Sequence, residues 1–355
     1  MKRRSLPVLA LALPIMVLAA APLLFWVRKL GGGTWAVLLL LAVWVGVPAA
    51  LPLSHLFRGE KTRIGLHLAA EAWLAFALYL WLSAALAWLL WLPLRGNRWE
   101  IPCACLFCGA FLLLFAGGMV NAAFLRTRRY RVDMGLEKPL RVALLSDLHL
   151  GFFTTRGMLR RIVRLTEREE PELVLFAGDF FDMDYDSLRH KAECAAMLRS
   201  VRGTLGTFGC LGNHDHYLKD DRKDTFLREA GVSILQDETA SVGGLTIFGR
   251  RDVQDPLREA WEPVGTAGGR PLLVLDHNPA SYREYIGSAD VLLCGHTHGG
   301  QTFPLDLLQK ALLKYPVSGL HEYGGLKTVV TSGAGFWGPP VRFGVSNEVI
   351  ILTIF

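Results

Sequence analysis

Four long stretches of this 355-residue chain contain no Asp, Glu, Lys or Arg, and they constrain the fold more than any other feature. A helix of 23 residues is about 35 Å long, which is enough to cross a hydrocarbon layer of about 30 Å. Four consecutive helices that are apolar on every face do not suit a soluble protein. We therefore expect a four-span transmembrane region in residues 1–125, with spans within Ser5–Val27, Leu30–Phe57, Ala72–Leu94 and Ile101–Leu125.

The net positive charge of the chain comes from the same region. Residues 1–125 carry a formal net charge of +7 and residues 126–355 carry −1, so no basic globular face, and hence no nucleic-acid partner, is expected. The short loops and flanks on one side of the predicted spans hold ten Lys and Arg residues, against four on the other side. Because the more positive side stays inside the cell, we expect a multi-pass protein of the cell or inner membrane whose C-terminal domain faces the cytoplasm.

The remainder of the chain has the pattern of an α/β domain. Residues 126–139 are basic and are expected to form a juxtamembrane linker, and residues 140–355 to form the globular domain. In that domain short apolar runs are separated by longer charge-bearing segments, at about residues 156–169 and 187–202, which are predicted to be helices. The principal predicted strands are Leu140–Leu145, Leu173–Ala177, Leu205–Leu211, Leu272–Leu275 and Val291–Cys294.

Metal-binding types of side chain follow each of these five predicted strands. Ligands of open α/β sheets bind beyond the carboxyl ends of the strands, so the five groups are expected to meet at one rim. Any one of the motifs is weak evidence, but five in succession form a specific pattern. In chain order they are Asp147-Leu148-His149, Gly178-Asp179-Phe180-Phe181-Asp182, Gly212-Asn213-His214-Asp215, Asp276-His277-Asn278 and Gly295-His296-Thr297-His298.

The motif set D-x-H, G-D-x-x-D, G-N-H-D, a single H and G-H-T-H resembles that of the calcineurin-like metallophosphoesterases. The ending G-H-T-H-G-G-Q, with the later S-G-A-G-F-W-G-P-P-V-R-F-G, is similar to a membrane-associated bacterial branch. The resemblance covers about residues 140–355 and implies a four-layer α/β/β/α sandwich with two metal ions, here preceded by the four-helix transmembrane region. It implies one metal held by Asp147, His149, Asp179 and His298, and a second held by Asp179, Asn213, His277 and His296.

The residue types suit this chemistry. Two divalent ions about 3.5–4 Å apart can hold the attacking and leaving oxygens of a displacement at phosphorus, and a hydroxide between them would be the nucleophile. Nitrogen and oxygen ligands without thiolates favour manganese, with iron or zinc as alternatives. His214, for which the resemblance implies no metal, is expected to protonate the leaving oxygen, and Asp215 to orient its ring. We interpret Asp182 as a support for the ligands rather than as part of a calcium-binding loop.

The predicted function is that of a membrane-anchored phosphoesterase that hydrolyses a phosphodiester or pyrophosphate bond. The segment Phe303–Tyr315 is either an interfacial helix that admits acyl chains or an ordinary amphipathic helix packed on the domain. The first alternative favours a lipid-linked substrate such as UDP-2,3-diacylglucosamine. A non-hydrolytic membrane sensor that binds a phosphorylated ligand in the same pocket is the alternative function. A transporter is disfavoured because Glu71, His55 and His67 all lie near span ends.

Overall fold

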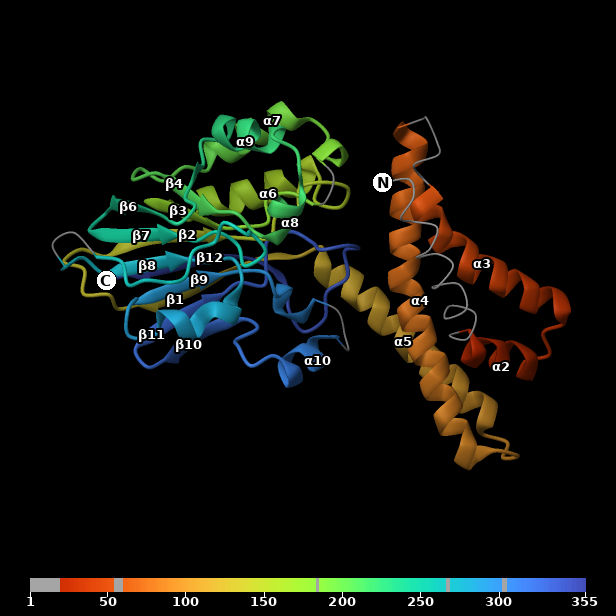
Figure 1. Ribbon diagram of the computed structural model, residues 1–355. Helices are drawn as coiled ribbons and strands as arrows, with labels where there is room; N and C mark the ends of the chain where they lie inside the picture. The colour runs from red at the N-terminus through yellow and green to blue at the C-terminus, as the bar shows by residue number, and fades with distance from the viewer. Residues whose placement is uncertain (1–19, 54–59, 183–184, 266–268, 302–304) are drawn as a thin grey trace. The chain divides into compact units, whose positions relative to one another are not determined.

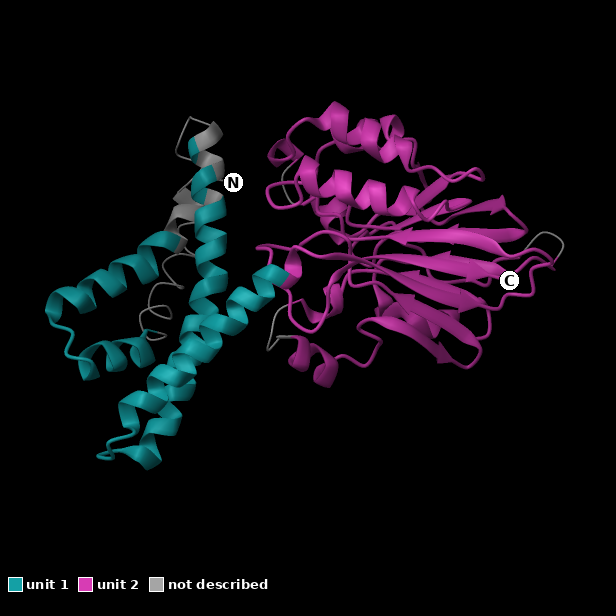
Figure 2. Ribbon diagram, turned by 180° about the vertical axis from the view of Figure 1, so that it is seen from behind, with its two compact units in different colours: residues 1–120 teal, residues 121–355 magenta. Residues whose placement is uncertain are grey.

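The computed structural model describes residues 20–53, 60–182, 185–265, 269–301 and 305–355. The chain forms two compact units, residues 1–120 and residues 121–355, which Figure 2 shows in different colours. The described part of the first unit is helical, whereas the second combines two β-sheets with helices (Figure 1).

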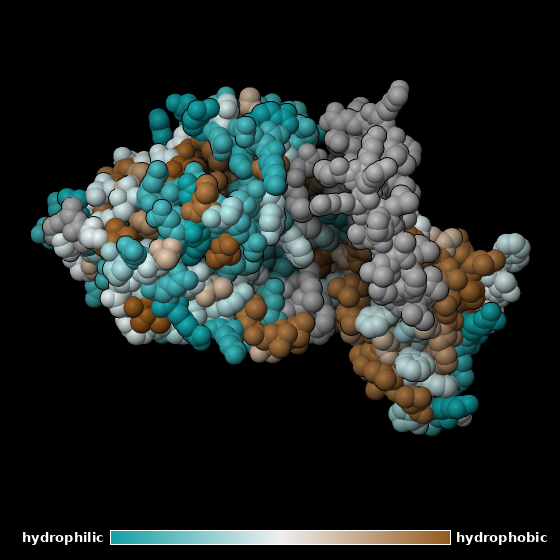
Figure 3. Space-filling view, viewed as in Figure 1, coloured by the Kyte–Doolittle hydropathy of each residue, from teal (hydrophilic) through white to brown (hydrophobic). Residues whose placement is uncertain are grey.

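The helical unit contains two segments that are long and apolar enough to cross a membrane, Leu68–Leu94 and Glu100–Ala122. Leu106 and Leu113, in the second of these, are 71% and 76% exposed, and hydrophobic side chains cover much of the visible surface of this unit (Figure 3). So much exposed apolar surface is unusual for a soluble domain and suits contact with lipid. The described helices are α2 (Ala21–Lys29), α3 (Thr34–Leu53), α4 (Glu60–Leu94) and α5 (Glu100–Ala122).

Two of the four predicted spans therefore coincide with helices that could cross a bilayer. In α3 the described apolar segment is only Thr34–Val47, which is shorter than a bilayer crossing requires. Most of the first predicted span lies outside the described residues. The four-helix transmembrane region is thus not confirmed and stays a prediction, together with the orientation that depends on it.

The second unit contains two six-stranded sheets, counted over the residues that the structure describes. In the first sheet β2, β3, β4 and β5 are parallel neighbours, and in the second sheet β7, β8, β9 and β11 are. The first sheet has the order β1 (Leu125–Val132), β12 (Asn347–Ile354), β2 (Leu140–Leu145), β3 (Leu173–Ala177), β4 (Thr207–Cys210) and β5 (Ser233–Ile234). The second has the order β10 (Gly319–Tyr323), β11 (Leu326–Val330), β9 (Val291–Cys294), β8 (Leu272–Leu275), β7 (Leu245–Gly249) and β6 (Glu238–Val242).

The central strands are apolar along their whole length because both of their faces are buried. Between the sheets, Leu144 and Leu175 of the first sheet pack in one core with Leu273 and Leu293 of the second, and all four have no exposed surface. A second core fills the outer face of the first sheet under three helices, which Figure 1 shows above that sheet. These helices are α6 (Arg156–Glu167), α7 (Lys191–Ser200) and α9 (Arg222–Glu229).

The outer face of the second sheet is covered differently. Tyr282 and Tyr285 of the 3₁₀ helix η4 (Pro279–Tyr285) pack there on Val274 and Leu292, with Trp261 beside them. The α/β fold with two sheets is therefore confirmed, but this outer layer contains a 3₁₀ helix and a loop where a layer of α-helices was expected. The other short elements are η2 (Tyr185–Ser187), α8 (Asn213–Tyr217), η5 (His298–Gly300) and α10 (Leu305–Leu312).

The basic segment that was expected to be a linker differs from that expectation. Its first part is β1, an edge strand that pairs in parallel with β12. Arg128 forms a 2.7 Å salt bridge with Glu348, and Arg129 forms one of 2.6 Å with Glu169. Charged side chains are common on edge strands, where they discourage pairing with other chains. Because its residues are charged, this strand is not identified when the sequence is searched for apolar runs.

Candidate metal centre and active site

The candidate ligands lie in sharp turns at the strand ends. Five of these residues have left-handed backbone conformations, with φ of 53° at Asp147, 43° at His149, 54° at Asp179, 70° at His296 and 51° at His298. Such conformations cost about 1 kcal/mol or more each for residues other than glycine, and they persist where the surrounding structure enforces them. Their concentration in the predicted motifs indicates a functional site.

Glycines bring the edges of the two sheets into contact. A Cβ atom on Gly295, after β9, would overlap the side chains of Ser146 and Asp147, after β2. A Cβ atom on Gly178, where φ is +81°, would lie 2.7 Å from His277 Nδ1. Both positions therefore require glycine because the backbone of one sheet approaches the ligand loops of the other.

One group of donors surrounds His149. Its Nε2 atom lies 3.0 Å from Nε2 of His298 and 3.6 Å from Oδ2 of Asp179. The Nε2 atom of His298 is 3.4 Å from Oδ1 of Asp147. Asp147, His149 and His298 form one of the possible metal-binding groups among the described residues. The sequence predicted these four residues to share one metal.

A second group of donors surrounds His277. Its Nε2 atom is 3.1 Å from Oδ2 of Asp179 and 3.2 Å from Oδ1 of Asn213, and His296 Nδ1 is 2.9 Å from the same Asn213 oxygen. His277 Nδ1 donates a hydrogen bond to the Ala177 carbonyl at 2.7 Å. A neutral His277 then has its lone pair on Nε2, which faces the other donors, as in many metal sites.

All seven predicted ligands therefore lie together, and Oδ2 of Asp179 is common to both groups. Asp147 and Asp179 are buried carboxylates facing imidazole nitrogens, and the facing Nε2 atoms of His149 and His298 cannot both keep a lone pair there without repulsion. His149 Nδ1 is buried without a hydrogen-bond partner in the described part of the chain. A divalent cation fits this set because nitrogen and oxygen donors would share it and the carboxylate charge would be neutralised.

Without a cation, the ionisable side chains of the cluster shift one another's pKa values in opposite directions. Burial and the nearby Asp179 raise the pKa of Asp147 to about 6. Burial lowers the pKa of His149 and of His296 to about 4. Burial also acts to lower the pKa of His277, but the Asp179 and Asp147 carboxylates outweigh it and hold that pKa well above its ordinary value. A positive charge at the centre of the cluster would therefore stabilise the Asp147 and Asp179 carboxylates.

His214 lies at the edge of the cluster. Its backbone N–H donates to Oδ1 of Asp179 at 2.9 Å, and its ring centroid is 4.6 Å from that of His149. Its Nδ1 atom faces Oδ1 of Asp182 at 3.6 Å. His214, His149 and Asp179 are also close enough to form a possible metal-binding group, although the sequence indicated no metal role for His214.

Asp215 does not take the role expected from the sequence. Its carboxylate accepts hydrogen bonds from the backbone N–H groups of Phe180, Phe181 and Gly212, at 3.2, 3.1 and 3.0 Å. These contacts hold the loop that carries Asp179, and no hydrogen bond joins the Asp215 carboxylate to the His214 ring among the described residues. Asp182 takes the orienting position instead. Three consecutive polar residues in G-N-H-D offered no means of telling which acid faces the histidine.

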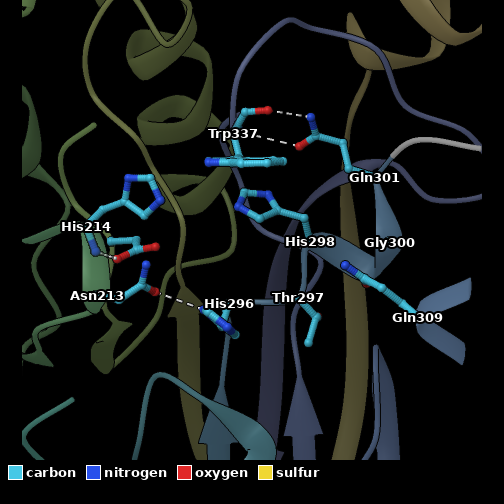
Figure 4. A pocket seen from close by; sticks show the side chains of 10 residues that line it. Asn213, His214, His296, Thr297, His298, Gly300, Gln301, Gln309 and Trp337 are labelled. Carbon is cyan, nitrogen blue, oxygen red and sulfur yellow. Dashed lines mark hydrogen bonds between the residues drawn. The ribbon is translucent and has the colours of Figure 1, made fainter. Parts of the chain in front are cut away.

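A pocket of about 260 Å³ opens beside the cluster. Figure 4 shows Trp337 and Gln301 joined on one side of it, where Gln301 Nε2 donates to the Trp337 carbonyl at 2.6 Å and the Trp337 N–H donates to Gln301 Oε1 at 3.3 Å. Both residues belong to the stretches G-H-T-H-G-G-Q and S-G-A-G-F-W that carry the resemblance. Sequence reasoning gave neither a role, because nothing in two stretches 36 positions apart shows that these side chains pair. The pocket is lined by Asp179, Asn213, His214, His296, Thr297, His298, Gly300, Gln301, Gln309 and Trp337.

Comparisons with known proteins agree with this geometry. Residues 140–300 match the model of the family described as calcineurin-like phosphoesterase. An uncharacterized metallophosphoesterase of Helicobacter pylori (strain J99) is 32% identical over 228 residues, which are 62% of this chain and 60% of the relative. Phosphodiesterase YaeI of Escherichia coli (strain K12) is 30% identical over 217 residues, which are 56% of this chain and 76% of the relative.

A third relative carries a membrane description. The transmembrane protein with metallophosphoesterase domain of Danio rerio is 31% identical over 261 residues, which are 65% of this chain and 58% of the relative. The chain thus spans about 60% of the length of the Helicobacter and Danio relatives.

Proposed function

Because the chain belongs to the calcineurin-like phosphoesterase family, we propose that it is a metal-dependent phosphoesterase that hydrolyses a phosphodiester or pyrophosphate bond. One observation carries the proposal: seven buried or partly buried nitrogen and oxygen donors from five strand ends converge on two adjoining positions. A purely structural cluster would pair its carboxylates with arginine or lysine, whereas here they face imidazoles.

The two positions correspond to two divalent cations. Asp147, His149 and His298 would hold one, Asn213, His277 and His296 the other, and Asp179 would contact both. When bound, such a pair supplies the charge that brings the attacking and leaving oxygens together at phosphorus. Manganese suits the mixed donors, with iron or zinc as alternatives.

His214 acts on the leaving group. It lines the pocket, so its ring can reach a phosphoester placed against the cluster. Burial acts to lower the pKa of His214, but the Asp182 and Asp179 carboxylates outweigh burial and raise it. This raised pKa favours the protonated ring, which can donate its proton to the leaving oxygen, while Asp182 faces Nδ1.

The substrate is proposed to be lipid-linked and the protein to be an integral membrane protein with its catalytic domain in the cytoplasm. Leu307, Leu308 and Leu312 of α10 are 54%, 52% and 66% exposed, and α10 follows the pocket-lining η5 closely in the chain. Figure 3 shows a hydrophobic patch on the surface where α10 lies. Exposed leucines beside a phosphoester pocket suit acyl chains. The two apolar helices of the first unit support the membrane location.

The test uses the full-length chain purified in detergent. We expect about two Mn²⁺ per chain and metal-dependent hydrolysis of UDP-2,3-diacylglucosamine or another lipid pyrophosphate in preference to bis-p-nitrophenyl phosphate. Asp179→Asn should lose metal and more than about 100-fold of the activity, because it removes the shared ligand. Asp220→Asn is the control, since the Asp220 carboxylate bonds to Arg222 alone among the described residues and lies on the surface.

Three outcomes would contradict parts of this proposal. Equal turnover of small soluble diesters with none of the lipids would exclude the lipid-linked substrate. Tight binding of phosphorylated ligands without turnover under any metal would favour the membrane sensor instead. A well-folded protein that takes up no divalent cation would exclude the metal centre itself.

A further inference from the structure

Arg342 is a fully buried arginine with an unusual set of partners. It has no exposed surface, and in the described part of the chain it forms no ion pair. Removing a guanidinium from water without a carboxylate partner is costly, and burial lowers the pKa of Arg342 to about 10. Such a residue persists where its hydrogen bonds are needed, so the partners of Arg342 indicate its role.

The guanidinium joins the loop after β11 to the loop after β9. Nη1 donates to the Ser332 carbonyl at 2.7 Å and Nη2 donates to the Gly335 carbonyl at 2.8 Å. Nη1 also donates to the His298 carbonyl at 3.3 Å. Ser332 and Gly335 bound the S-G-A-G segment, and His298 belongs to G-H-T-H. Arg342 therefore connects two motifs that are far apart in the chain.

The S-G-A-G segment lies directly against the first ligand loop. The N–H of Gly335 donates to the Asp147 carbonyl at 2.9 Å, and the N–H of Ala334 donates to the Ser146 carbonyl at 3.0 Å. A Cβ atom on Gly333 would come within 2.8 Å of Asp147 Cβ. Through this segment, Arg342 ties the backbone of Asp147 to that of His298.

The guanidinium also lies behind the His298 ring. Nη2 is 3.3 Å from His298 Nδ1, whereas Nε2 on the other side of the ring faces Asp147 and His149. Nη2 can only donate, so this contact is a hydrogen bond only while the proton of the His298 ring is on Nε2. If Nε2 binds a cation, the proton is on Nδ1, and the guanidinium then packs against that edge of the ring without donating to it. The ring is thereby held with Nε2 toward the cluster.

The end of α5 is attached to the same structure. Asn121, the first residue of the second unit, donates its Nδ2 hydrogens to the carbonyls of Arg342 at 3.1 Å and Val345 at 2.7 Å. Asn347 also reaches this helix end, since its Nδ2 donates to the Ala122 carbonyl at 2.6 Å, but it has no hydrogen bond to Arg342 among the described residues. Asn121 is thus the side chain that holds the backbone of Arg342 to the last turn of α5.

We propose that Arg342 is a positioning residue for the cation position formed by Asp147, His149 and His298, and that Asn121 couples this position to the end of α5. The inference rests on the proposed metal centre. Arg342 contacts neither substrate nor cation and acts through the Asp147 and His298 loops.

The test is a Mn²⁺ titration of the full-length chain in detergent, in which electron paramagnetic resonance measures free Mn²⁺. In Arg342→Met one of the two equivalents should bind about 10- to 100-fold more weakly, as expected when a partner that orients a ligand is removed. Arg342→Lys should recover part of this affinity because it restores a donor to the same carbonyls. Arg250→Met is the matched control, since Arg250 is 2% exposed but bonds to Asp237 and Glu259.

The coupling to α5 is tested by a second pair of variants. Asn121→Ala should lower the affinity for the same equivalent of Mn²⁺ about threefold to tenfold. The effect is smaller because Asn121 acts through Arg342. Asn347→Ala removes an amide that also bonds to the end of α5, and it should leave the affinity for both equivalents of Mn²⁺ unchanged. Thermal unfolding in the presence of a chelator shows whether each variant folds, independently of the metal.

The outcomes separate this inference from the proposed function. If the wild type binds two Mn²⁺ and Arg342→Met binds both with unchanged affinity, the positioning role is wrong and the metal centre stands. Equal losses in Arg342→Met and Arg250→Met would also overturn it, because general destabilisation would then be the cause. If the wild type binds no Mn²⁺, the proposed function fails and this inference with it.

Discussion

The two sheets of the second unit contribute different chemistry to one site. The ends of β2, β3 and β4 supply both carboxylates, Asp147 and Asp179, together with the proposed proton donor His214. The ends of β8 and β9 supply only imidazoles to the cluster, from His277, His296 and His298. Neither edge alone is a complete site, so the apolar core between the sheets is what assembles the proposed metal centre.

The second sheet is not poor in acids, but the acid next to His277 in the chain is neutralised. Asp276 directly precedes His277, yet its carboxylate is bound by Arg258 at 2.8 Å and by the Tyr285 hydroxyl at 2.6 Å. Asn278, on the other side, accepts from the Ala280 N–H at the start of η4. Of three adjacent polar side chains, only His277 remains for the cluster. At this strand end the acid therefore has a cationic partner, whereas Asp147 and Asp179 of the first sheet face imidazoles.

The largest effect is expected at His214, the first-sheet side chain that has no counterpart in the second sheet. His214→Ala should lower kcat by about 10²- to 10⁴-fold, the usual contribution of a positioned proton donor. It should retain two Mn²⁺, because the seven proposed ligands are untouched. Steady-state kinetics and metal analysis on the same preparation check both points.

His216, two positions after His214, provides the matched control: in His216→Ala the lost ring is one that lies beside Tyr217. A wild-type rate in His214→Ala would show that the assignment is wrong. Loss of one metal together with the rate would instead place His214 among the ligands, in the group that it forms with His149 and Asp179.

The second prediction concerns the contact between the sheets. In Gly295→Ala the new methyl group would overlap Ser146 and Asp147, so the edges must separate. Overpacking of this kind lowers the free energy of unfolding by about 1–3 kcal/mol. We also expect weaker binding of Mn²⁺, since the ligands of one sheet move away from those of the other. Chemical denaturation in chelator and a Mn²⁺ titration measure the two effects.

Gly157→Ala serves as the control, because only Thr155 lies within 4 Å of a Cβ atom there, at 3.7 Å. In the first turns of α6 an alanine should be neutral or stabilising. If Gly295→Ala keeps both its stability and its metals, the sheets are not held together at this point, and the comparison between them loses its structural basis.

The sequence predicted which side chains meet at the rim, whereas it predicted their surroundings less well; their role as metal ligands stays a prediction. Asp147, His149 and Asp179 follow apolar strands, so the position of a strand end already placed their side chains at a common rim. The strand β1 was missed because Arg128 and its neighbours conceal an edge strand. Arg342 was missed because a buried arginine is recognised by the carbonyls around it, which come from Ser332, Gly335 and His298 and are unpredictable from composition or spacing.

The third prediction separates the two acids of the first sheet. Asp182→Asn should lower kcat about tenfold with both metals retained, because it removes the charge that raises the pKa of His214 and faces its Nδ1. Asp215→Asn should mainly lower stability, by about 1–3 kcal/mol, since its amide group would face backbone N–H donors of the Asp179 loop. A larger loss of turnover in Asp215→Asn than in Asp182→Asn, at equal metal content, would show that Asp215 orients the His214 ring, as expected from the sequence.

The smallest effect is expected from substitutions of the pocket-lining residues that follow strands of the second sheet. Thr297, Gln301 and Trp337 line the pocket without belonging to the proposed ligands, and the indole of Trp337 is 54% exposed. Trp337→Ala should raise KM about fivefold, which corresponds to about 1 kcal/mol, with kcat unchanged. Trp337→Phe should keep most of the affinity, since a ring still covers the substrate. A fall in kcat at unchanged KM would mean that this wall aligns the reacting bond, and the division between a first sheet that moves the proton and a second that binds the substrate would not hold.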